Sequence, residues 1–577
     1  MDENMRVEKD QESATYVDEE NSFAKKSVVE APFAEEPVEK ETSVEKPVEK
    51  ETSAEKPIEK EFSAEKPVEK KTFAEEPAVE APIVKKAPVR KISEEQRKRE
   101  IEQQERESRV QGIGRQFSFY GVISILFGVL YSLCLYRNKS GILVPVFTAA
   151  AYLLAVAVLK KMSVTVKRGS VFLIVVSVLI SISTCRTANG FIIFFNKQAV
   201  ILLWWVFWLH QFYDDRNWNI GKYFSAIVML VIHTIGMLGY PFKHCADYIK
   251  SLKGQKSKTG ILVIFGVILA IPIVLLLALI LSYADAVFQD IMVTFFDSFF
   301  SIRTIFSSSL KAFFGILVLY CLICEVSRRD VSGVAVDKRS QEPVLAVTVM
   351  GLVALLYLIF CGIQIIYLFM GRGTLPDGMT YSEYARQGFF QLVFVAVLNL
   401  VLVLLCLKYF KKSRVLNIVL TVISICTYIM IASAGYRMIL YVAEYHLTLL
   451  RILVLWFLAV LSIMMAGVMV IIYKNQFPLF KFCLVVVSVC YLGLSWMKPD
   501  LVIAQYNISH MEEMDNSELW DLCDLSADAA PVLANVEGHP INQSEPLKFY
   551  FDEKKEEMKE MTWRTYNFSY AKIKKYY

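Results

Sequence analysis

The sequence predicts an all-α polytopic membrane protein with about 11–12 transmembrane helices, a disordered N-terminal tail and a small C-terminal extramembrane region. Hydrophobic residues make up 55% of the 577-residue chain, whereas an ordinary soluble domain has about 45–50%. Residues 1–115 are hydrophilic, so the apolar residues are concentrated in the remainder. Runs of about 20 apolar residues, the length that crosses a hydrocarbon core of about 30 Å, recur after Phe117. The lipid bilayer is therefore an expected partner.

Composition argues against several other classes of protein. The formal net charge of +4 is too small to favour a nucleic-acid partner. Most of the eleven cysteines lie in apolar runs, where a thiol behaves as a small hydrophobe. Cys321 and Cys324 form a C-x-x-C pair, but no second Cys or His pair accompanies them, so packing is favoured over metal or redox chemistry. We find no catalytic, metal or nucleotide motif and therefore predict no cofactor.

The N-terminal tail, residues 1–90, contains a ten-residue Glu/Lys/Pro repeat. A proline in each unit interrupts any long helix, and the few aliphatic residues cannot offset chain entropy. The segment is therefore predicted to be disordered. It is interpreted either as a spacer or as a docking tail for a cytoplasmic protein partner. The register is marked by Pro37, Pro47, Pro57, Pro67 and Pro77.

Residues 91–116 are expected to form a charged juxtamembrane helix. Ser93 and Gln96 resemble a capping box, and the residues that follow are good helix formers. The basic side chains would be available to anionic headgroups. The first apolar segment starts near Phe117, too far along the chain for a cleavable signal peptide, and is expected to be a signal anchor.

The polytopic helical domain is expected to occupy residues 117–496. Its candidate spans are the apolar segments of sufficient length. They are 117–136, 141–159, 170–184, 198–213, 223–240, 260–282, 310–325, 344–370, 388–407, 415–434, 450–473 and 479–496.

Loop charge orients these spans, because short cytoplasmic loops collect Lys and Arg. Three candidates between Lys160 and Lys258 would put one basic loop outside, so one of the three is expected not to cross. That candidate is 223–240 or the short 170–184. The resulting topology has about eleven crossings, a cytoplasmic N-terminus and an extracytoplasmic C-terminus. The basic segments are 106–115, 160–168, 243–258, 328–339 and 408–414.

The C-terminal extramembrane region is expected at residues 497–577. It begins with an apparent turn at Lys498, Pro499 and Asp500 and contains a helix-like stretch at 548–561. The basic and aromatic finish at 572–577 is interpreted either as a segment on the membrane surface or as a frayed terminus.

Ionisable side chains near the hydrocarbon are candidate functional residues, since each costs about 2.5–3.5 kcal/mol at mid-bilayer. Asp285 ends the apolar run that begins near Ile261, and it either lies in a wet loop or lines a cation-attracting vestibule. Glu383 and Arg386 are spaced i, i+3 and can pair on a helix, which an interfacial anchor also explains. Asp500 is a further candidate.

The most polar connection between spans carries Arg437, Tyr441, Glu444 and Arg451. In one continuous helix these residues, with Thr448, would form a narrow polar stripe, because their offsets from Arg437 are close to whole numbers of helical turns. Such a stripe would be an internal ion-pair cluster or a ligand site. The alternative is a helix break near His446, with Thr448 as N-cap of the next span and Arg451 at position N3.

Several short motifs follow one another in the second half of the chain. They are 284–288, 383–389, 437–441, 447–451, 499–507, 525–531 and 563–567. Together these motifs resemble the domain-of-unknown-function family 4173, multi-pass bacterial membrane proteins related to family 4153. The resemblance covers roughly residues 260–577. His446 stands where the family pattern has glycine, and the N-terminal tail lies outside the resemblance. It implies a bacterial cytoplasmic membrane and no particular activity.

The sequence leaves three functions open. The polar residues favour a transporter-like protein, although no inverted repeat is visible. The alternative is a non-enzymatic membrane scaffold or signalling component, because the chain has two large appendages. A membrane enzyme acting on lipid-linked substrates is least favoured, because the histidines are scattered and no hydrolase motif is present. No oligomeric state is predicted.

Overall fold

A computed structural model of the chain divides into residues 1–89 and residues 90–577. It describes residues 94–251, 302–328, 339–366, 388–511 and 516–576, apart from 216, 217, 219, 475, 476 and 560, together with scattered positions between 266 and 289. The predicted disordered tail and Ser93 lie outside the described residues. So do Glu383, Arg386 and most of the candidate span 260–282.

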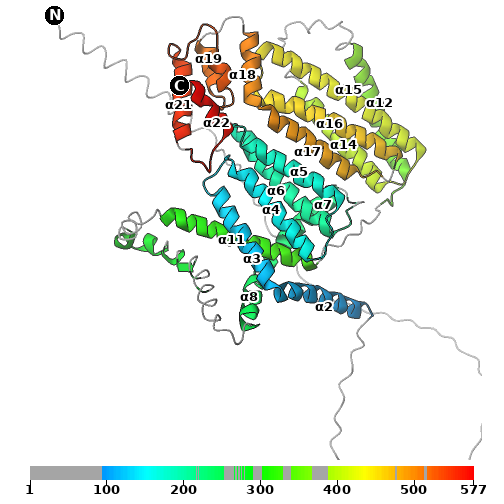
Figure 1. The fold of residues 1–577 in the computed structure, drawn as a ribbon. Coiled ribbons are helices and arrows are strands. Elements are labelled where there is room, and N and C mark those ends of the chain that lie inside the picture. Colours follow the sequence, from blue (N-terminus) through cyan, green and yellow to red (C-terminus); the bar gives the residue numbers. More distant parts are fainter. Residues whose placement is uncertain are drawn as a thin grey trace, which may run out of the picture. The chain divides into compact units, whose positions relative to one another are not determined.

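The described residues form helices joined by short turns, and no strand (Figure 1). Nine of these helices are long and apolar enough to cross a membrane, or ten if α7 and α8, which meet at a 45° bend, are one span. The shorter apolar helix α5 corresponds to the predicted segment 170–184. The helices before the C-terminal region are α2 (Glu94–Arg115), α3 (Phe117–Leu135), α4 (Leu143–Lys161), α5 (Arg168–Thr184), α6 (Gly190–Phe212), α7 (Ile220–Gly236), α8 (Tyr240–Ser251), α11 (Ile302–Arg328), α12 (Pro343–Gln364), α14 (Phe389–Tyr409), α15 (Arg414–Tyr445), α16 (Leu449–Tyr473) and α17 (Leu479–Met497).

Among the helix ends that differ from the sequence-based prediction, such as the start of α11 at Ile302 instead of 310, two have a local explanation. α6 begins at Gly190, before the predicted start at 198, because the side chain of Asn189 accepts a hydrogen bond from the backbone N–H of Ile192 and caps the helix. α15 continues to Tyr445, past the predicted end at 434, since Gly435 lies inside it without breaking it.

The helices form two groups, each with its own apolar packing, and α17 contacts both groups. Helices α3 to α7 and α11 surround one core, which includes the fully buried Phe207, Trp208 and Tyr320. Helices α12, α14, α15 and α16 enclose further apolar clusters, and α17 packs against both α5 and α16. α3 and α11 cross closely at Gly128, where a Cβ would collide with the backbone oxygen of Ala312. Small residues permit such close crossings between membrane helices.

Hydrogen bonds define two ends of this bundle. At one end, called here the basic end, Lys167 Nζ donates to the backbone oxygens of His210 and Tyr213, 2.5 and 2.7 Å away. At the opposite end, called the capped end, the N–H of Ile142 donates to the oxygen of Tyr566 at 2.9 Å, and that of Phe568 to Cys185 at 2.9 Å. The C-terminal region therefore packs on one end only.

α7 contacts the basic end at both of its own ends. Near its start, the ring of Tyr223 stacks on Phe480, with centroids 3.8 Å apart. Near its end, His233 Nδ1 lies 3.2 Å from Glu325 Oε1, close to the end of α11. There Arg109 donates to the backbone oxygen of Arg328 at 3.1 Å. α7 therefore lies along this end of the bundle.

Residues 498–577, called here the C-terminal module, have an apolar core of their own. Tyr550, Phe551 and Ile573 are fully buried in it, so α22 is packed in place near the end of the chain. The predicted helix-like stretch 548–561 corresponds to α21. The elements are α18 (Pro499–His510), α19 (Asn516–Cys523), α20 (Ala530–Leu533), α21 (Glu545–Lys559), α22 (Phe568–Ile573) and the 3₁₀ turn η2 (Lys574–Tyr576).

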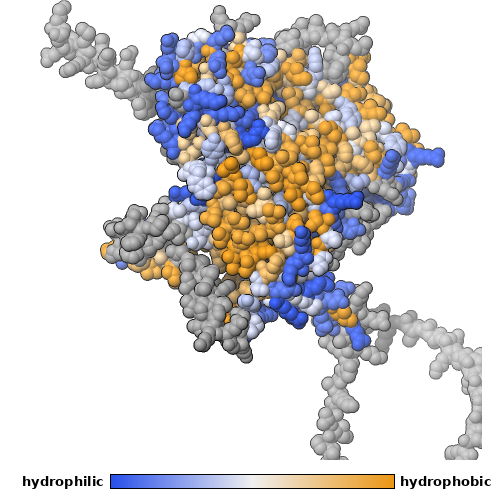
Figure 2. Space-filling model, in the orientation of Figure 1, coloured by the Kyte–Doolittle hydropathy of each residue, from blue (hydrophilic) through white to orange (hydrophobic). Residues whose placement is uncertain are grey.

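The surface separates into apolar and polar zones. Figure 2 shows apolar side chains gathered over the parallel helices, with hydrophilic residues over α2 and over the C-terminal helices. Many of the exposed large side chains are aliphatic residues in these helices, among them Val122, Leu153 and Leu355. Because lipid tails are as apolar as these side chains, a bilayer accounts for their exposure.

Candidate functional site

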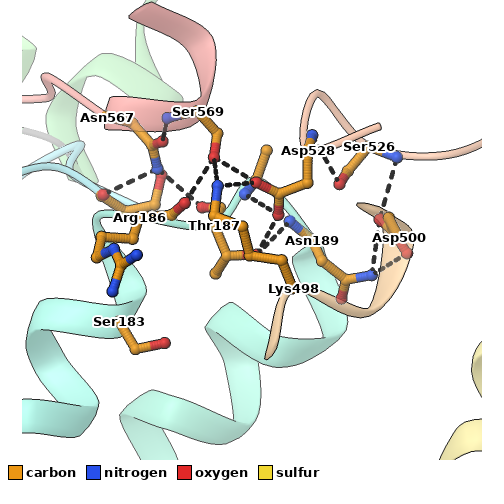
Figure 3. Close-up of polar contacts among 12 residues, drawn as sticks. Ser183, Arg186, Thr187, Asn189, Lys498, Asp500, Ser526, Asp528, Asn567 and Ser569 are labelled. Carbon is orange, nitrogen blue, oxygen red and sulfur yellow. Dashed lines mark hydrogen bonds and ion pairs between the residues drawn. The ribbon is translucent and has the colours of Figure 1, made fainter. Parts of the chain in front are cut away.

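A cluster of buried polar side chains lies where the C-terminal module meets the capped end (Figure 3). It is called here the polar junction. Three parts of the chain supply it: the turn between α5 and α6, the connection from α17 to α18, and the turns of the module around Asp528 and Ser569.

The backbone bends as it enters this cluster. Lys498 has a positive φ of 57°, which ends α17, and Pro499 follows at the first position of α18. Proline suits that position because its missing N–H has no partner in the first turn of a helix. The side chain of Lys498 and that of Asp500 are thereby both directed into the junction (Figure 3).

Asp528 is at the centre and is only 2% exposed. Its Oδ2 accepts hydrogen bonds from the Thr187 hydroxyl at 2.5 Å and from the N–H of Ala188 at 3.0 Å. Its Oδ1 accepts one from Lys498 Nζ at 2.7 Å and one from the Ser569 hydroxyl. The carboxylate therefore joins α6, α17 and the module in one network.

Asp500 forms a second joint beside the first. Asn189 Nδ2 donates to both of its carboxylate oxygens at 2.9 Å. The N–H of Ser526 donates to Oδ2 at 3.1 Å. Since Asn189 also caps α6, one side chain ties the start of that helix to the module.

Asn567 closes the remaining side of the junction. Its Nδ2 donates to the backbone oxygens of Thr187 and Ser140, 2.9 and 3.2 Å away. Its Oδ1 accepts from the N–H of Ser569 at 2.8 Å. The loop before α22 is thus held against both the α3–α4 and the α5–α6 turns.

Neutral polar groups continue from the junction into the bundle. The hydroxyls of Ser183 and Ser495 share a hydrogen bond. The Ser495 and Tyr491 hydroxyls each donate to Asn196 Oδ1 at 2.8 Å. A similar neutral contact lies between α12, α14 and α15, where Asn399 accepts from Tyr357 at 2.9 Å and donates to Thr427 at 3.0 Å.

The polar junction is suited to holding parts together rather than to turning over a substrate. Both carboxylates accept hydrogen bonds on each oxygen, and the Lys498 ammonium is engaged by Asp528 and Ser569. Within the described part of the chain, no three His, Cys, Asp or Glu side chains form a group that could hold a metal ion. The geometry is that of a buried, fully bonded polar network, which specifies a unique arrangement of the elements it joins.

The continuous polar stripe expected from Arg437 to Arg451 is wrong, and the alternative of a helix break is correct. α15 ends at Tyr445, His446 has a φ of 64°, and α16 begins at Leu449 with Thr448 as N-cap. The amide of Asn507 bonds both backbone groups of Leu447, at 2.8 and 3.1 Å, and holds the connection to α18. These two hydrogen bonds from Asn507 stabilise the connection next to the positive φ of His446, a conformation that non-glycine residues seldom adopt.

Arg451 caps the helix that precedes its own. Its guanidinium donates to the backbone oxygens of Tyr445 and His446 and lies 4.3 Å from the centre of the Tyr441 ring. Carbonyl groups at a helix C-terminus lack partners and favour a cation. Glu444 is exposed, and among the described residues no ion pair joins it to either arginine.

Arg437 has a different environment. It is 8% exposed and lies near the capped end of α15, where a Cβ on Gly388 would come within 3.4 Å of its Nη1. Gly388 has a φ of 86° and precedes α14. One turn earlier on α15, the Ser433 hydroxyl donates to Gln364 at 2.7 Å. Arg437 therefore belongs to a polar region between α12, α14 and α15.

Asp285 is exposed and interrupts its helix. Its Oδ1 accepts hydrogen bonds from the N–H groups of Val287 and Phe288, at 2.7 and 3.2 Å, as an N-cap does. Of the six candidate residues that the structure describes, only Asp500 is part of the polar junction. Arg437, Tyr441 and Arg451 lie elsewhere on α15 and α16.

Sequence reasoning missed Asp528, Asn189 and Asn567 as site residues. Asp528 and Asn567 were within motifs that carried the family resemblance, but neither lies in an apolar run, so intramembrane cost did not single them out. Asn189 had a legible signal, because Asn directly before a long apolar run is a preferred helix N-cap.

A second polar cluster at the basic end was also missed. Asp215, between α6 and α7, lies 2.7 Å from His210 Nδ1 and accepts from Lys481 Nζ at 3.0 Å and from the Tyr223 hydroxyl. Burial raises the pKa of Asp215, but the hydrogen bonds from His210, Tyr223 and Lys481 outweigh it and hold that pKa well below its ordinary value. The carboxylate fastens α6, α7 and α17 together.

We predict that Asp528→Asn loosens the C-terminal module. The substitution leaves Lys498 nearly buried without its carboxylate, and breaking a buried ion pair costs about 3–5 kcal/mol. In detergent, limited trypsin digestion should remove the module several times faster than in the native protein, and the unfolding midpoint should fall. Asp524→Asn, four residues earlier and exposed, is the control. Equal digestion of the two variants would contradict a fastening role for Asp528.

Asp215 is predicted to stabilise the basic end in a pH-dependent way. Because its pKa is lowered in the folded protein, the stabilisation is present above the ordinary value of 3.8 and is lost as the pH falls below it. Asp215→Asn should cost about 2 kcal/mol near neutral pH, the contribution of hydrogen bonds to a charged group. The difference in unfolding midpoint from the native protein should shrink below about pH 4.

The control for this measurement is Asp247→Asn, an exposed carboxylate on α8. Its unfolding midpoint should follow that of the native protein at every pH. A difference between native protein and Asp215→Asn that stays constant down to pH 3 would show that the carboxylate charge contributes nothing.

Comparison with known proteins gives a family and no activity. No curated protein and no solved structure matches the chain. The model of a family described as "Domain of unknown function (DUF4153)" matches residues 172–536, more than half of the chain. The match begins earlier than the expected residue 260 and includes α5, α6 and the Asp528 turn. The chain, an integral membrane protein by its many long apolar helices, belongs to the DUF4153 family.

Proposed function

We propose that this chain is a non-enzymatic membrane scaffold or signalling component. Its N-terminal tail would recruit a cytoplasmic partner, and its C-terminal module would bind or sense on the opposite side of the membrane. The observation that carries the proposal is the polar junction, in which Asp528 joins α6, α17 and the module through four hydrogen bonds. A module fastened in this way moves with the membrane helices.

The proposed topology has a cytoplasmic N-terminus and an extracytoplasmic C-terminus. Lys167, Arg339 and Lys481 all bond to neighbouring elements at the basic end, which agrees with the excess of Lys and Arg in cytoplasmic loops. The position of α7 along this end supports the hypothesis that 223–240 does not cross. With 260–282 as a span, about eleven crossings result. The further hypotheses of a bacterial cytoplasmic membrane and of membership in the related family 4173 accompany this proposal.

A transporter-like function is the second candidate, and Arg437 is the observation that favours it. Its guanidinium is nearly buried beside Gly388, and ionisable groups buried among membrane helices often mark a substrate pathway. Against this candidate, polar side chains deeper in the described helices are neutral and engaged by neutral partners: Asn196 accepts from Ser495, and Asn399 donates to Thr427. Asp500, which a membrane enzyme would need, is engaged by Asn189 and Ser526.

The scaffold proposal predicts a partner that depends on both appendages. Photo-crosslinking residues placed within 1–90 should capture a cytoplasmic protein in cells, and Asp528→Asn should change its yield severalfold because the module is loosened. Asp524→Asn is the matched control. In the same cells, an impermeant maleimide should label Lys555→Cys from outside and Lys161→Cys only after permeabilisation. Recovery of no crosslinked protein from any position within 1–90, or the reverse labelling, would contradict the proposal.

The transporter candidate is separated from the scaffold by the same purified protein in proteoliposomes. Arg437→Gln should leave solute flux unchanged if the chain is a scaffold. Arg414→Gln, an exposed arginine at the other end of α15, is the control. A flux that Arg437→Gln abolishes and Arg414→Gln preserves would replace the scaffold proposal with transport.

A further inference from the structure

An open pocket lies on the C-terminal module, away from the polar junction. It is bounded by the end of α21, the loop from Met561 to Tyr566, and α22 with η2. Its volume is about 480 Å³, within the range of pockets that hold small ligands. Two lysines, Lys559 and Lys574, line it together with Trp563.

The loop that forms one wall is bonded to the turn between α3 and α4. Arg564 donates to the backbone oxygen of Tyr136 at 3.3 Å, and its own backbone oxygen accepts from Asn138 Nδ2 at 3.1 Å. The N–H of Ile142 donates to the oxygen of Tyr566 at 2.9 Å. The pocket is therefore held beside the point where α3 ends and α4 begins.

That point corresponds to the boundary of the apolar layer. α3 is an uninterrupted apolar helix, and Leu133 in its last turn is 57% exposed on the bundle surface. Tyr136, Arg137 and Asn138 follow directly, and they are polar or amphipathic. A lipid that contacts Leu133 with its acyl chain would bring its headgroup to the level of the loop.

The side chains of the pocket match such a headgroup. Trp563 is 74% exposed, and Tyr566 in the same loop and Phe568 at the start of α22 are also exposed. Trp and Tyr gather at the membrane interface, where an apolar ring meets polar headgroups. Lysine ammonium groups attract anionic lipids at the same level.

Positive charge also surrounds the pocket on the side of the bundle. Lys311 and Arg137 both lie over the ring of Tyr136, 4.9 and 5.6 Å from its centre. Of the pocket lysines, Lys559 lies 2.5 Å from Glu556. Lys574 makes no ion pair within the part of the chain that the structure describes. An anion in the pocket would therefore be attracted chiefly by Lys574.

We propose that this pocket binds the phosphodiester headgroup of an anionic phospholipid in the adjacent leaflet. Lys574 and Lys559 lie on the phosphate side, and Trp563 lies against the glycerol and upper acyl region. The bound lipid fixes the loop 561–566 between the module and the α3–α4 turn. The proposal requires only that the module rests on the bilayer surface, and it holds whichever side of the membrane that is.

The first test is fluorescence quenching by brominated lipid. The full-length protein is placed in nanodiscs of phosphatidylcholine with phosphatidylglycerol, brominated at a shallow acyl position. The quenchable emission should be smaller in Trp563→Phe than in the native protein. Trp520→Phe is the matched control, since Trp520 packs beside Phe549, about 15 Å along α21 from Lys559. Equal quenching of the native protein and Trp563→Phe would overturn the proposal.

The second test measures the lipid itself by native mass spectrometry. Lys574→Gln should reduce retained phosphatidylglycerol by roughly fivefold, the effect of one lysine that faces an anionic headgroup. Lys559→Gln should reduce it by less, because Glu556 offsets the charge of Lys559. Lys548→Gln, about three turns earlier on the same face of α21, should retain it fully. Unchanged retention in the double variant would overturn the proposal, as would equal retention of phosphatidylcholine by the native protein. Displacement by glycerol phosphate alone would assign the pocket to a free anion instead.

Discussion

The ion pair between Asp528 and Lys498 is the interaction on which the arrangement of the C-terminal half depends. A carboxylate that is 2% exposed is tolerable only if all of its lone pairs are used. Here the partners come from the start of α6, the end of α17 and the module itself, so the burial of one charge requires three elements to be in place. The same requirement explains why Asn189 and Asn567, rather than apolar residues, occupy neighbouring positions. Each satisfies backbone groups that the close approach of turns would otherwise leave without partners.

Polarity along the described helices follows the cost of charge in lipid. Among the described residues, the buried carboxylates lie near helix ends, whereas the interior contacts use Asn196, Asn399 and hydroxyl groups. These carboxylates are Asp215, Glu325, Asp500 and Asp528. A neutral amide that bonds two neighbouring helices contributes specificity without the desolvation of an ion. α5 is an example of a membrane helix whose buried face uses small neutral polar side chains. Its buried face places Ser170, Ser177, Ser181 and Thr184 in one stripe, so α5 packs closely against its neighbours although it is short.

Much of the fold was predictable because the membrane imposes one rule on the backbone. A run of apolar residues of sufficient length must be a helix in lipid, so the predicted segments 117–136, 344–370 and 450–473 agree with α3, α12 and α16 at one or both ends. The errors of the prediction lie in segments outside the apolar runs, to which this rule does not apply. α15 continues beyond the apolar run because Arg437 and Glu444 are good helix formers. The break at His446 depends on Asn507, some sixty residues away, and no local pattern records that contact.

The candidate site was far less predictable, because Asp528 and Asn567 are ordinary residues of polar turns until the chain folds. The rule that identified Asp500 was the cost of a charge beside an apolar run, and it applies only within the bilayer. Asp285 and Glu444 met the same criterion and are exposed. A search for charges beside apolar runs therefore finds residues that are costly to place in lipid. It overlooks residues whose hydrogen bonds join distant parts of the chain.

Lys498 alone separates α17 from α18. Such a connection contains no flexible linker. The angle between the axes of α17 and α18 is therefore fixed by a single left-handed residue and a proline. A tilt of α17 in response to bilayer thickness or lateral tension would therefore be transmitted directly to α18. The module would report the mechanical state of the lipid without a hinge.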